Sequence, residues 1–288
     1  MTGTGQSIEA HELDALVSAL SQWQVDGMPV QLHPGDLGWH WRFGVPTLLQ
    51  CLRVWRDGAR VRAVGMLDGE VIRMGLAPEA DADEAFAKSL ADELTDSQES
   101  LFGAPVASIE ARFGQALQGE LDRRGWLSGE PWTPLIRELS DPVPDGGLDV
   151  RVIGPEQVDD RVFVQRTALT PSVFTVEQWH AMAQGSPYRQ GRCLVGYNTE
   201  GVPVAAATVW SAGAGRGGLI EPMGTDREHR GHGYGRAITL AAAAALREMG
   251  ASRALVATET FNAGAVPTYE SAGFVRQPTA WDYRRPNG

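Results

Sequence analysis

Hydrophobic positions in the first half of the chain switch between helical and strand spacing. Four apolar residues near the start recur at intervals of three and four, which places them on one face of a helix. Farther along, apolar runs shorten and are separated by turn signals, as in β-hairpins. The elements predicted are a helix over 8–23 with Leu13, Leu16, Val17 and Leu20 on its apolar face, strands over 61–67 and 70–74 joined by Asp68-Gly69, and a helix over 82–94.

The second half contains more strands, with helices between them. The elements predicted are strands over 148–153, 193–197, 202–210, 219–223 and 253–258, an Ala-rich helix over 233–249 that stops at Gly250, a short helix that ends at Gly273, and a terminal strand. A helical region is also expected between the first two of these strands. The order predicts an α/β (α+β) fold in which helices cover a mixed sheet.

Two domains are predicted from a linker and from the length of the chain. The 288 residues suffice for two domains of ordinary size. The stretch from Ser140 to Gly147 is rich in Pro, Gly and Asp and separates two patterned regions. We therefore expect a first domain over 1–140, a linker over 141–148 and a second domain over 149–288.

A glycine-rich loop between a predicted strand and the Ala-rich helix is the main chemical signal. It reads Arg230-Gly231-His232-Gly233-Tyr234-Gly235-Arg236. Glycines allow close backbone approach, and amides at a helix start form an anion site that the helix dipole strengthens. The spacing is G-x-G-x-G, whereas a dinucleotide site has G-x-G-x-x-G. The loop predicts binding of a pyrophosphate-like anion.

Charge places this anion site in the less acidic half. The net charge is −11; residues 1–140 carry 11 Lys and Arg against 21 Asp and Glu, and residues 141–288 carry 14 against 15. Nucleic acid and anionic membranes are therefore not expected as partners. Cys51 and Cys193 have no metal-ligand spacing, and we see neither a secretion signal nor an apolar run of membrane-helix length. We expect a cytoplasmic protein without a metal, either a monomer or a homodimer.

A second set of residues, after the loop, supplies a family resemblance. Arg230-x-x-Gly233-x-Gly235 is followed by Asn262 and then by Tyr269-Glu270-x-x-Gly273-Phe274. On these motifs, residues 149–288 resemble a GNAT-superfamily N-acetyltransferase domain. The whole chain resembles tandem GNAT proteins, in which a degenerate N-terminal copy precedes an active C-terminal one. One departure is Arg227, which stands where the family usually has Pro.

The resemblance implies two GNAT-like domains, each a mixed, largely antiparallel twisted sheet flanked by helices, and acetyl-CoA as cosubstrate. It implies that the pantetheine arm pairs with Met223, Gly224 and Thr225, and that the pyrophosphate rests on the amides of Gly231, His232, Gly233, Tyr234, Gly235 and Arg236. Asn262 would bind the pantetheine arm, Arg230 would add positive charge, and Tyr269 would protonate the leaving thiolate. Phe163, Phe174 and Trp179 fall where such folds build the acceptor site.

Other interpretations stay open at the sequence level. Glu221, beside the expected thioester, is the candidate general base for an amine acceptor, but it could instead bind the acceptor's charge or form a salt bridge. Tyr269 could be a core aromatic residue. The protein as a whole could be a non-catalytic acyl-CoA sensor, or could acylate an oxygen or a sulfur.

An internal repeat predicts that only the second copy binds CoA. At an offset of 148 residues Phe113 falls on Phe261, Gly125 on Gly273 and Trp126 on Phe274, which suggests duplication of one fold. The loop residues Arg230, Gly233 and Gly235 correspond to Ala82, Ala85 and Ala87, with Asp83 and Glu84 between them. Methyl groups would block close approach and carboxylates would repel a pyrophosphate.

Overall fold

The computed structural model describes residues 4–95, 101–103, 106–169 and 171–286. Within them one sheet of twelve strands runs through both halves of the chain. The strands are β1 (Leu52–Asp57), β2 (Arg60–Asp68), β3 (Val71–Leu76), β4 (Ser108–Glu110), β5 (Leu127–Glu138), β6 (Asp149–Val152), β7 (Gly191–Tyr197), β8 (Pro203–Trp210), β9 (Gly217–Thr225), β10 (Arg253–Glu259), β11 (Val275–Arg276) and β12 (Ala280–Arg284). Most neighbours are antiparallel, and the pairs β3–β4 and β9–β10 are parallel.

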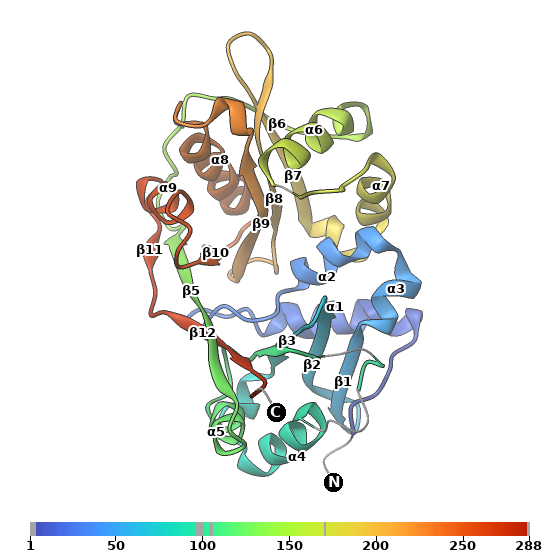
Figure 1. Cartoon of the computed structure of the whole chain (residues 1–288). Helices are drawn as coiled ribbons and strands as arrows, with labels where there is room; N and C mark the ends of the chain where they lie inside the picture. Colours follow the sequence, from blue (N-terminus) through green and yellow to red (C-terminus); the bar gives the residue numbers. More distant parts are fainter. Residues whose placement is uncertain (1–3, 96–100, 104–105, 170, 287–288) are drawn as a thin grey trace.

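Helices flank this sheet in both halves (Figure 1). They are α1 (Leu13–Gln22), α2 (Pro34–His40), α3 (Val45–Gln50), α4 (Glu84–Thr95), α5 (Gln115–Arg123), α6 (Val158–Ala168), α7 (Val176–Gln184), α8 (Tyr234–Glu248) and α9 (Ala265–Ser271). Every helix and strand that the hydrophobic pattern predicts is present, with small shifts at the ends. The predicted fold class is confirmed: a mixed, mostly antiparallel twisted sheet flanked by helices.

The two halves exchange their last strands. The strand order is β1-β2-β3-β4-β12-β5-β10-β9-β8-β7-β6. β5 ends the first half yet pairs with β10 of the second, and β12 ends the second half yet pairs with β4 of the first. In Figure 1 the green β5 and the red β12 run side by side between the halves. Each half therefore completes the sheet of the other.

The elements repeat in the order that the sequence offset predicts. Val71 and Ile109 lie in β3 and β4, and the residues 148 positions later, Leu219 and Ala257, lie in β9 and β10. The helices α4 and α8 follow β3 and β9 in the two halves. The division into domains at 141–148 stays a prediction; in the structure this stretch connects β5 to β6.

Alternating side chains of the second half's strands pack on opposite faces of the sheet. Leu194 of β7 belongs to the cluster beneath α8, whereas its neighbours Cys193 and Val195 belong to the cluster beneath α6 and α7. The alanine-rich face of α8 is buried in the cluster that contains Leu194. Ile238 and Leu246 of this helix have no exposed surface. Burial of each such side chain contributes about 1.5–3 kcal/mol. This packing fixes the start of α8 over the sheet.

The strands β9 and β10 separate partway along their length. They pair only from Gly217 and Arg253 to Leu219 and Leu255. Beyond these residues each strand continues without the other, so a gap opens between them. In the first copy the pairing of β3 with β4 continues to Arg73, which is the repeat counterpart of Glu221. The separation is thus wider in the second copy.

Candidate active site

A cavity of about 1290 Å³ fills the gap between β9 and β10. Its walls come from β9, the glycine-rich loop, α9, the end of α6 and, from the other half, β3 and β4. All but one of the residues predicted for catalysis or CoA binding line it: Glu221, Met223, Gly224, Thr225, Arg230, Gly231, Gly233, Tyr234, Gly235, Arg236, Asn262 and Tyr269. The exception is His232, an exposed residue whose ring stacks on Tyr234 with a centroid distance of 5.7 Å. The structure thus brings these residues together, while their roles stay predictions.

Left-handed glycines shape the start of α8 into an anion-binding loop. Gly231 and Gly233 have φ angles of +82° and +83°, which side-chain-bearing residues rarely adopt, and no atom lies within 4 Å of where a Cβ would be. The amide of Ala237 donates to the carbonyl of Gly233 at 3.0 Å, one turn into the helix. Amides before that point have no partner within a helix and carry the positive end of its dipole. The loop is therefore suited to hold phosphate oxygens.

Gly235 allows three elements to meet at the loop. A Cβ at this position would lie 3.2 Å from Cγ2 of Thr268 and 3.3 Å from Oγ1 of Thr225. These two threonines belong to α9 and β9. Because glycine has no Cβ, the first turn of α8 comes close to both elements.

The guanidinium groups of Arg230 and Arg236 brace neighbouring helices. Arg230 Nη2 donates to the carbonyl of Ala168 at 3.0 Å, and Arg236 Nε donates to that of Ser271 at 2.9 Å. Both carbonyls lie at helix C-termini, where the helix dipole favours a cation. Both arginines also line the cavity, so positive charge remains at this end.

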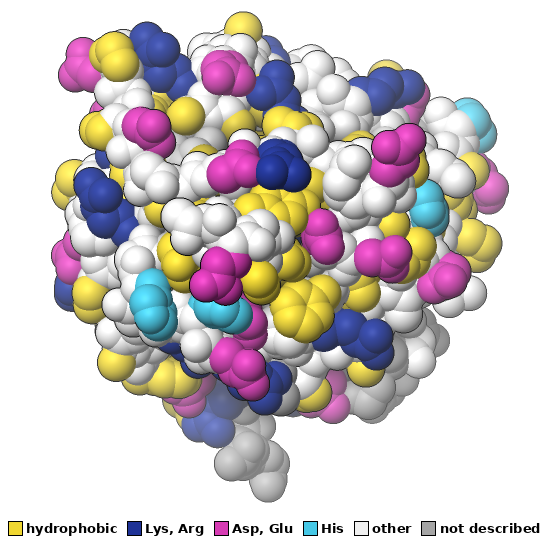
Figure 2. Space-filling model, turned by 90° about the horizontal axis from the view of Figure 1, so that it is seen from above, with side chains coloured by type: hydrophobic (Ala, Val, Ile, Leu, Met, Phe, Trp, Pro, Cys, Tyr) yellow, Lys and Arg dark blue, Asp and Glu magenta, His cyan; other side chains and the backbone are white. Residues whose placement is uncertain are grey.

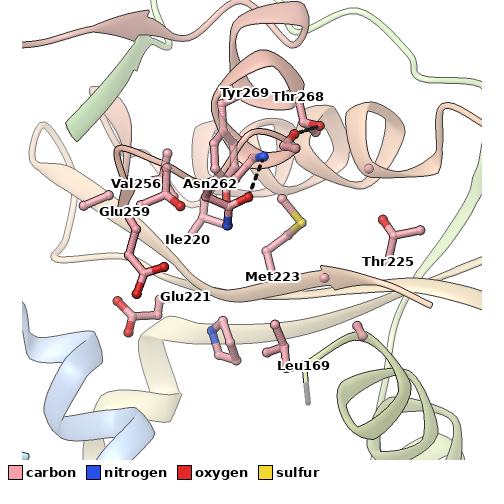
Figure 3. Close-up of a pocket in the computed structure, with 18 of the residues that line it drawn as sticks. Leu169, Ile220, Glu221, Met223, Thr225, Val256, Glu259, Asn262, Thr268 and Tyr269 are labelled. Carbon is pink, nitrogen blue, oxygen red and sulfur yellow. Dashed lines mark hydrogen bonds between the residues drawn. The ribbon is translucent and has the colours of Figure 1, made fainter. Parts of the chain in front are cut away.

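Tyr269 is a buried residue of α9 whose side chain faces the cavity (Figure 3). Its ring is 6% exposed and packs against Phe274, with centroids 5.9 Å apart. Burial, and secondarily the charge of Glu221, raise the pKa of the Tyr269 phenol well above its usual value of about 10. The hydroxyl therefore stays protonated near neutral pH and is able to donate a proton into the cavity.

The backbone of Glu221 is fixed by a hydrogen bond, whereas its side chain is partly exposed. Its carbonyl accepts a hydrogen bond from Nε1 of the buried Trp210 at 2.7 Å, and it precedes Pro222 through a cis peptide bond. The pairing of β8 with β9 shifts register at this point. The carboxylate, 39% exposed, lies 3.7 Å from Nη1 of Arg73. Figure 3 shows Glu221 and Glu259 extending toward the same part of the cavity.

One side-chain atom of Asn262 makes a hydrogen bond within the protein. Its Oδ1 accepts a hydrogen bond from the amide of Ala265, at 3.1 Å, where α9 begins. This contact is the dashed line beside Asn262 in Figure 3. The residue thus supports the helix that carries Tyr269, and it also lines the cavity.

The two ends of the cavity differ in charge. The loop end carries Arg230 and Arg236. The other end faces the first half and has more acidic groups than basic ones: Asp68, Glu110, Glu221, Glu259 and Asp282 against Arg73 and Arg112. Burial raises the pKa of Asp282 to about 6. On the face of the molecule seen in Figure 2, acidic and basic side chains are interspersed and no large area carries one sign of charge.

Residues contributed by the first half were not identified from the sequence. Arg73, Glu110 and Arg112 lie more than a hundred positions before the loop, and no local pattern marks them. The 148-residue offset was the one available signal, because it aligns Arg73 with Glu221. Phe163, Phe174 and Trp179 are not among the described residues that line the cavity.

Those three aromatic residues serve packing or face solvent instead. Phe174 and Trp179 are each 3% exposed and belong to the apolar cluster beneath α6 and α7. Phe163 is 46% exposed. The end of the cavity opposite the loop is formed partly by residues of the first half.

The counterpart of the loop in the first copy is filled by its own carboxylate. Asp83 Oδ1 accepts a hydrogen bond from the amide of Phe86 at 3.0 Å, and Oδ2 pairs with Arg62 at 2.9 Å. A carboxylate already occupies the amides at the start of α4. This supports the prediction that the first copy does not bind CoA.

Comparisons with known proteins agree with this geometry. The family model "Acetyltransferase (GNAT) family" matches residues 163–274. A mycothiol acetyltransferase from Thermobispora bispora is 43% identical over 68 residues, which are 24% of this chain and 23% of that protein. The match therefore spans less than a quarter of the relative's length.

Solved structures match nearly the whole chain. An acetyltransferase of the GNAT family from Colwellia psychrerythraea is 15% identical with a TM-score of 0.60, and 98% of this chain and 99% of that one are covered. A tandem GNAT protein from the clavulanic acid biosynthesis pathway is 17% identical with a TM-score of 0.56, and 99% of each chain is covered. At these identities the likeness concerns the fold.

Residues 163–274, which match the GNAT acetyltransferase family, are the part of the chain that resembles an acetyltransferase domain. They contain Glu221, the loop, Asn262 and Tyr269. In the described residues no group of side chains suited to a metal ion is found, and no helix has both the length and the apolar character to cross a membrane.

Proposed function

We propose that the chain transfers an acetyl group from acetyl-CoA to an amine of a small molecule or to an exposed amino group, by direct attack. The observation that carries the proposal is one cavity with an anion-binding loop at one end, Tyr269 at its wall and carboxylates at the other end. The loop suits the pyrophosphate, and the carboxylates suit a cationic acceptor. A cytoplasmic location, one CoA site per chain and independence of nucleic acid and membranes belong to the same proposal.

The proposed reaction needs two proton transfers that the cavity residues supply. The acceptor nitrogen forms a bond to the thioester carbon, and its proton passes to Glu221. The carbon–sulfur bond breaks, and the leaving thiolate takes the proton of the Tyr269 hydroxyl. For an acceptor that attacks as the neutral amine, the products are the acetylated amine and free CoA. The proton on Glu221 returns through solvent to the Tyr269 phenolate, so atoms and charge balance. Positioning the two substrates together supplies the rest of the rate enhancement.

The backbone of β9 contributes to positioning. Met223, Gly224 and Thr225 follow Glu221 along the strand and line the cavity toward the loop. Their order along the strand suits an extended pantetheine arm that runs from the loop to Glu221, with Asn262 on the opposite wall. The acetyl group would then lie between Tyr269 and Glu221.

The test is thiol release from acetyl-CoA against a panel of amines, with alcohol and thiol analogues of each. We expect wild type to turn over at least one amine and Tyr269→Phe to lose about 100-fold or more in kcat, with little change in KM for acetyl-CoA. The matched control is Tyr188→Phe, which removes a hydroxyl outside the cavity lining that the described residues form.

The other interpretations have distinct outcomes in this assay. Tight acetyl-CoA binding without turnover of any acceptor would support a sensor. Turnover of alcohols or thiols alone would move the acceptor to oxygen or sulfur. Full activity of Tyr269→Phe would refute its role as the acid.

A further inference from the structure

Arg73 of the first copy and Glu221 of the second are repeat counterparts that meet in space. They are separated by 148 positions, the offset that aligns the two copies. One is on β3 and the other on β9, the corresponding strands. Nη1 of Arg73 lies 3.7 Å from Oε1 of Glu221, and both residues line the cavity. At this position the first copy carries a cation and the second an anion.

The Arg73 side chain is fixed by two buried carboxylates. Its Nη2 lies 3.0 Å from Oδ1 of Asp36, and its Nε lies 3.4 Å from Oε2 of Glu110. The side chain of Arg73 is 16% exposed, and those of Asp36 and Glu110 are 1% and 7% exposed. A guanidinium that pairs with a carboxylate at Nη2 and another at Nε cannot turn toward solvent. Its Nη1 is the atom that faces Glu221.

The position of Arg73 separates Glu221 from like charge. Asp36 and Glu110 contact the guanidinium from the first half, and Glu221 contacts it from the second. Without the cation, three carboxylates would surround one site. Such crowding disfavours the ionised form of each. A general base, however, has to be ionised and correctly oriented before it accepts a proton.

We propose that Arg73 is a positioning residue for the acetyl transfer, which holds Glu221 as an oriented carboxylate at the acceptor end of the cavity. The inference rests on the proposed function and extends it. The first copy then does more than shape a wall, because it supplies the cation on which the base of the second copy depends. A structural ion pair alone would predict loss of stability without a change in pH dependence.

The other ionisable groups whose charges reach Glu221 lie on several elements. They are Asp36 on α2, Arg42 in the 3-10 turn Trp41–Phe43, and Tyr269 on α9. Glu259, on β10, extends toward the same region in Figure 3. Arg42 acts through its charge alone among these described contacts, whereas Arg73 forms an ion pair with Glu221.

The test is the pH dependence of kcat/KM for Arg73→Gln and Arg73→Lys beside wild type. We expect the acid limb of Arg73→Gln to move upward by about one pH unit or more, because a neighbouring cation is lost. Arg73→Lys keeps the charge, so its limb should return most of the way to that of wild type. The control is Arg62→Gln, which breaks a comparable ion pair with Asp83 away from the cavity lining formed by the described residues and should leave the limb in place.

A second variant guards against misfolding of Arg73→Gln. In the double variant Arg73→Gln with Asp36→Asn, the buried carboxylate that would be left without its cation is also removed. The side-chain oxygen of the new asparagine can still accept a hydrogen bond from the amide of His33. This variant should also show the raised acid limb. A wild-type limb in both Gln variants would overturn the role of Arg73 and leave the proposed function standing. An inactive wild type would instead refute the proposed function.

Discussion

At the scale of single residues, the environment of Tyr269 matters more than its identity. An exposed tyrosine would lose its proton at a pKa of about 10. Here burial comes first and the charge of Glu221 second in raising the pKa of the phenol. The same burial that makes Tyr269 look like a core aromatic residue keeps its proton in place for a thiolate. Core packing and proton donation are therefore compatible roles for this side chain.

This environment predicts the alkaline behaviour of the enzyme. Because the pKa of Tyr269 is raised, the protonated acid is present throughout the accessible alkaline range. We expect kcat at saturating substrates to show no decline from about pH 8 to about pH 10. Initial rates across this range measure it. A decline centred below about pH 9 that disappears in Tyr269→Phe would contradict the assignment.

At the scale of elements, the loop and the start of α8 form one unit. The positive φ angles of Gly231 and Gly233 shape a loop that lines the cavity, and α8 is anchored by its buried alanine face. Local backbone conformation and helix packing thus fix the anion site together. The sequence pattern predicted both parts, because each depends on residues close to one another in the chain.

A matched pair of glycine variants tests the loop. Gly233→Asp places a carboxylate beside the expected pyrophosphate and should weaken acetyl-CoA binding at least about 100-fold through repulsion and steric exclusion. Gly201→Asp is the control, since its φ of +79° and its open surroundings match those of Gly233, which has a φ of +83°. It should cost a similar backbone strain and leave binding unchanged. Equal affinity in the two variants would refute the loop assignment.

Elements that depend on distant partners could not be predicted. Gly35 and Gly38 in α2 are poor helix formers, so this stretch gives no helical signal. In the structure both glycines face the ring of Trp210, and Cβ atoms there would lie 2.4 and 2.5 Å from it. Tertiary packing therefore stabilises a helix that local propensity disfavours.

The candidate site likewise contains residues that the sequence predicted and residues that it did not. The loop, Asn262 and Tyr269 belong to motifs that are compact in sequence, and all were identified. Arg73 and Glu110 reach the cavity because the halves exchange strands, and that exchange leaves no mark in the hydrophobic pattern. Phe163, Phe174 and Trp179, expected near the acceptor site, lie outside the described lining of this cavity.

At the scale of the whole molecule, strand exchange joins the two copies of the repeat in one sheet. β5 and β12 each complete the sheet of the other half, so the first copy cannot be removed without opening the sheet of the second. In the first copy, Asp83 occupies the amides of α4 and the strands β3 and β4 stay paired as far as Arg73. The duplicated fold thus leaves one cavity open and uses the other copy as part of its wall.

The most direct test of this account is calorimetric titration of the chain with acetyl-CoA. The account predicts one molecule bound per chain, no detectable binding to Gly233→Asp, and unchanged stoichiometry for Asp83→Ala. Two molecules per chain, or one molecule still bound by Gly233→Asp with wild-type affinity, would contradict the claim that the second copy alone holds the donor.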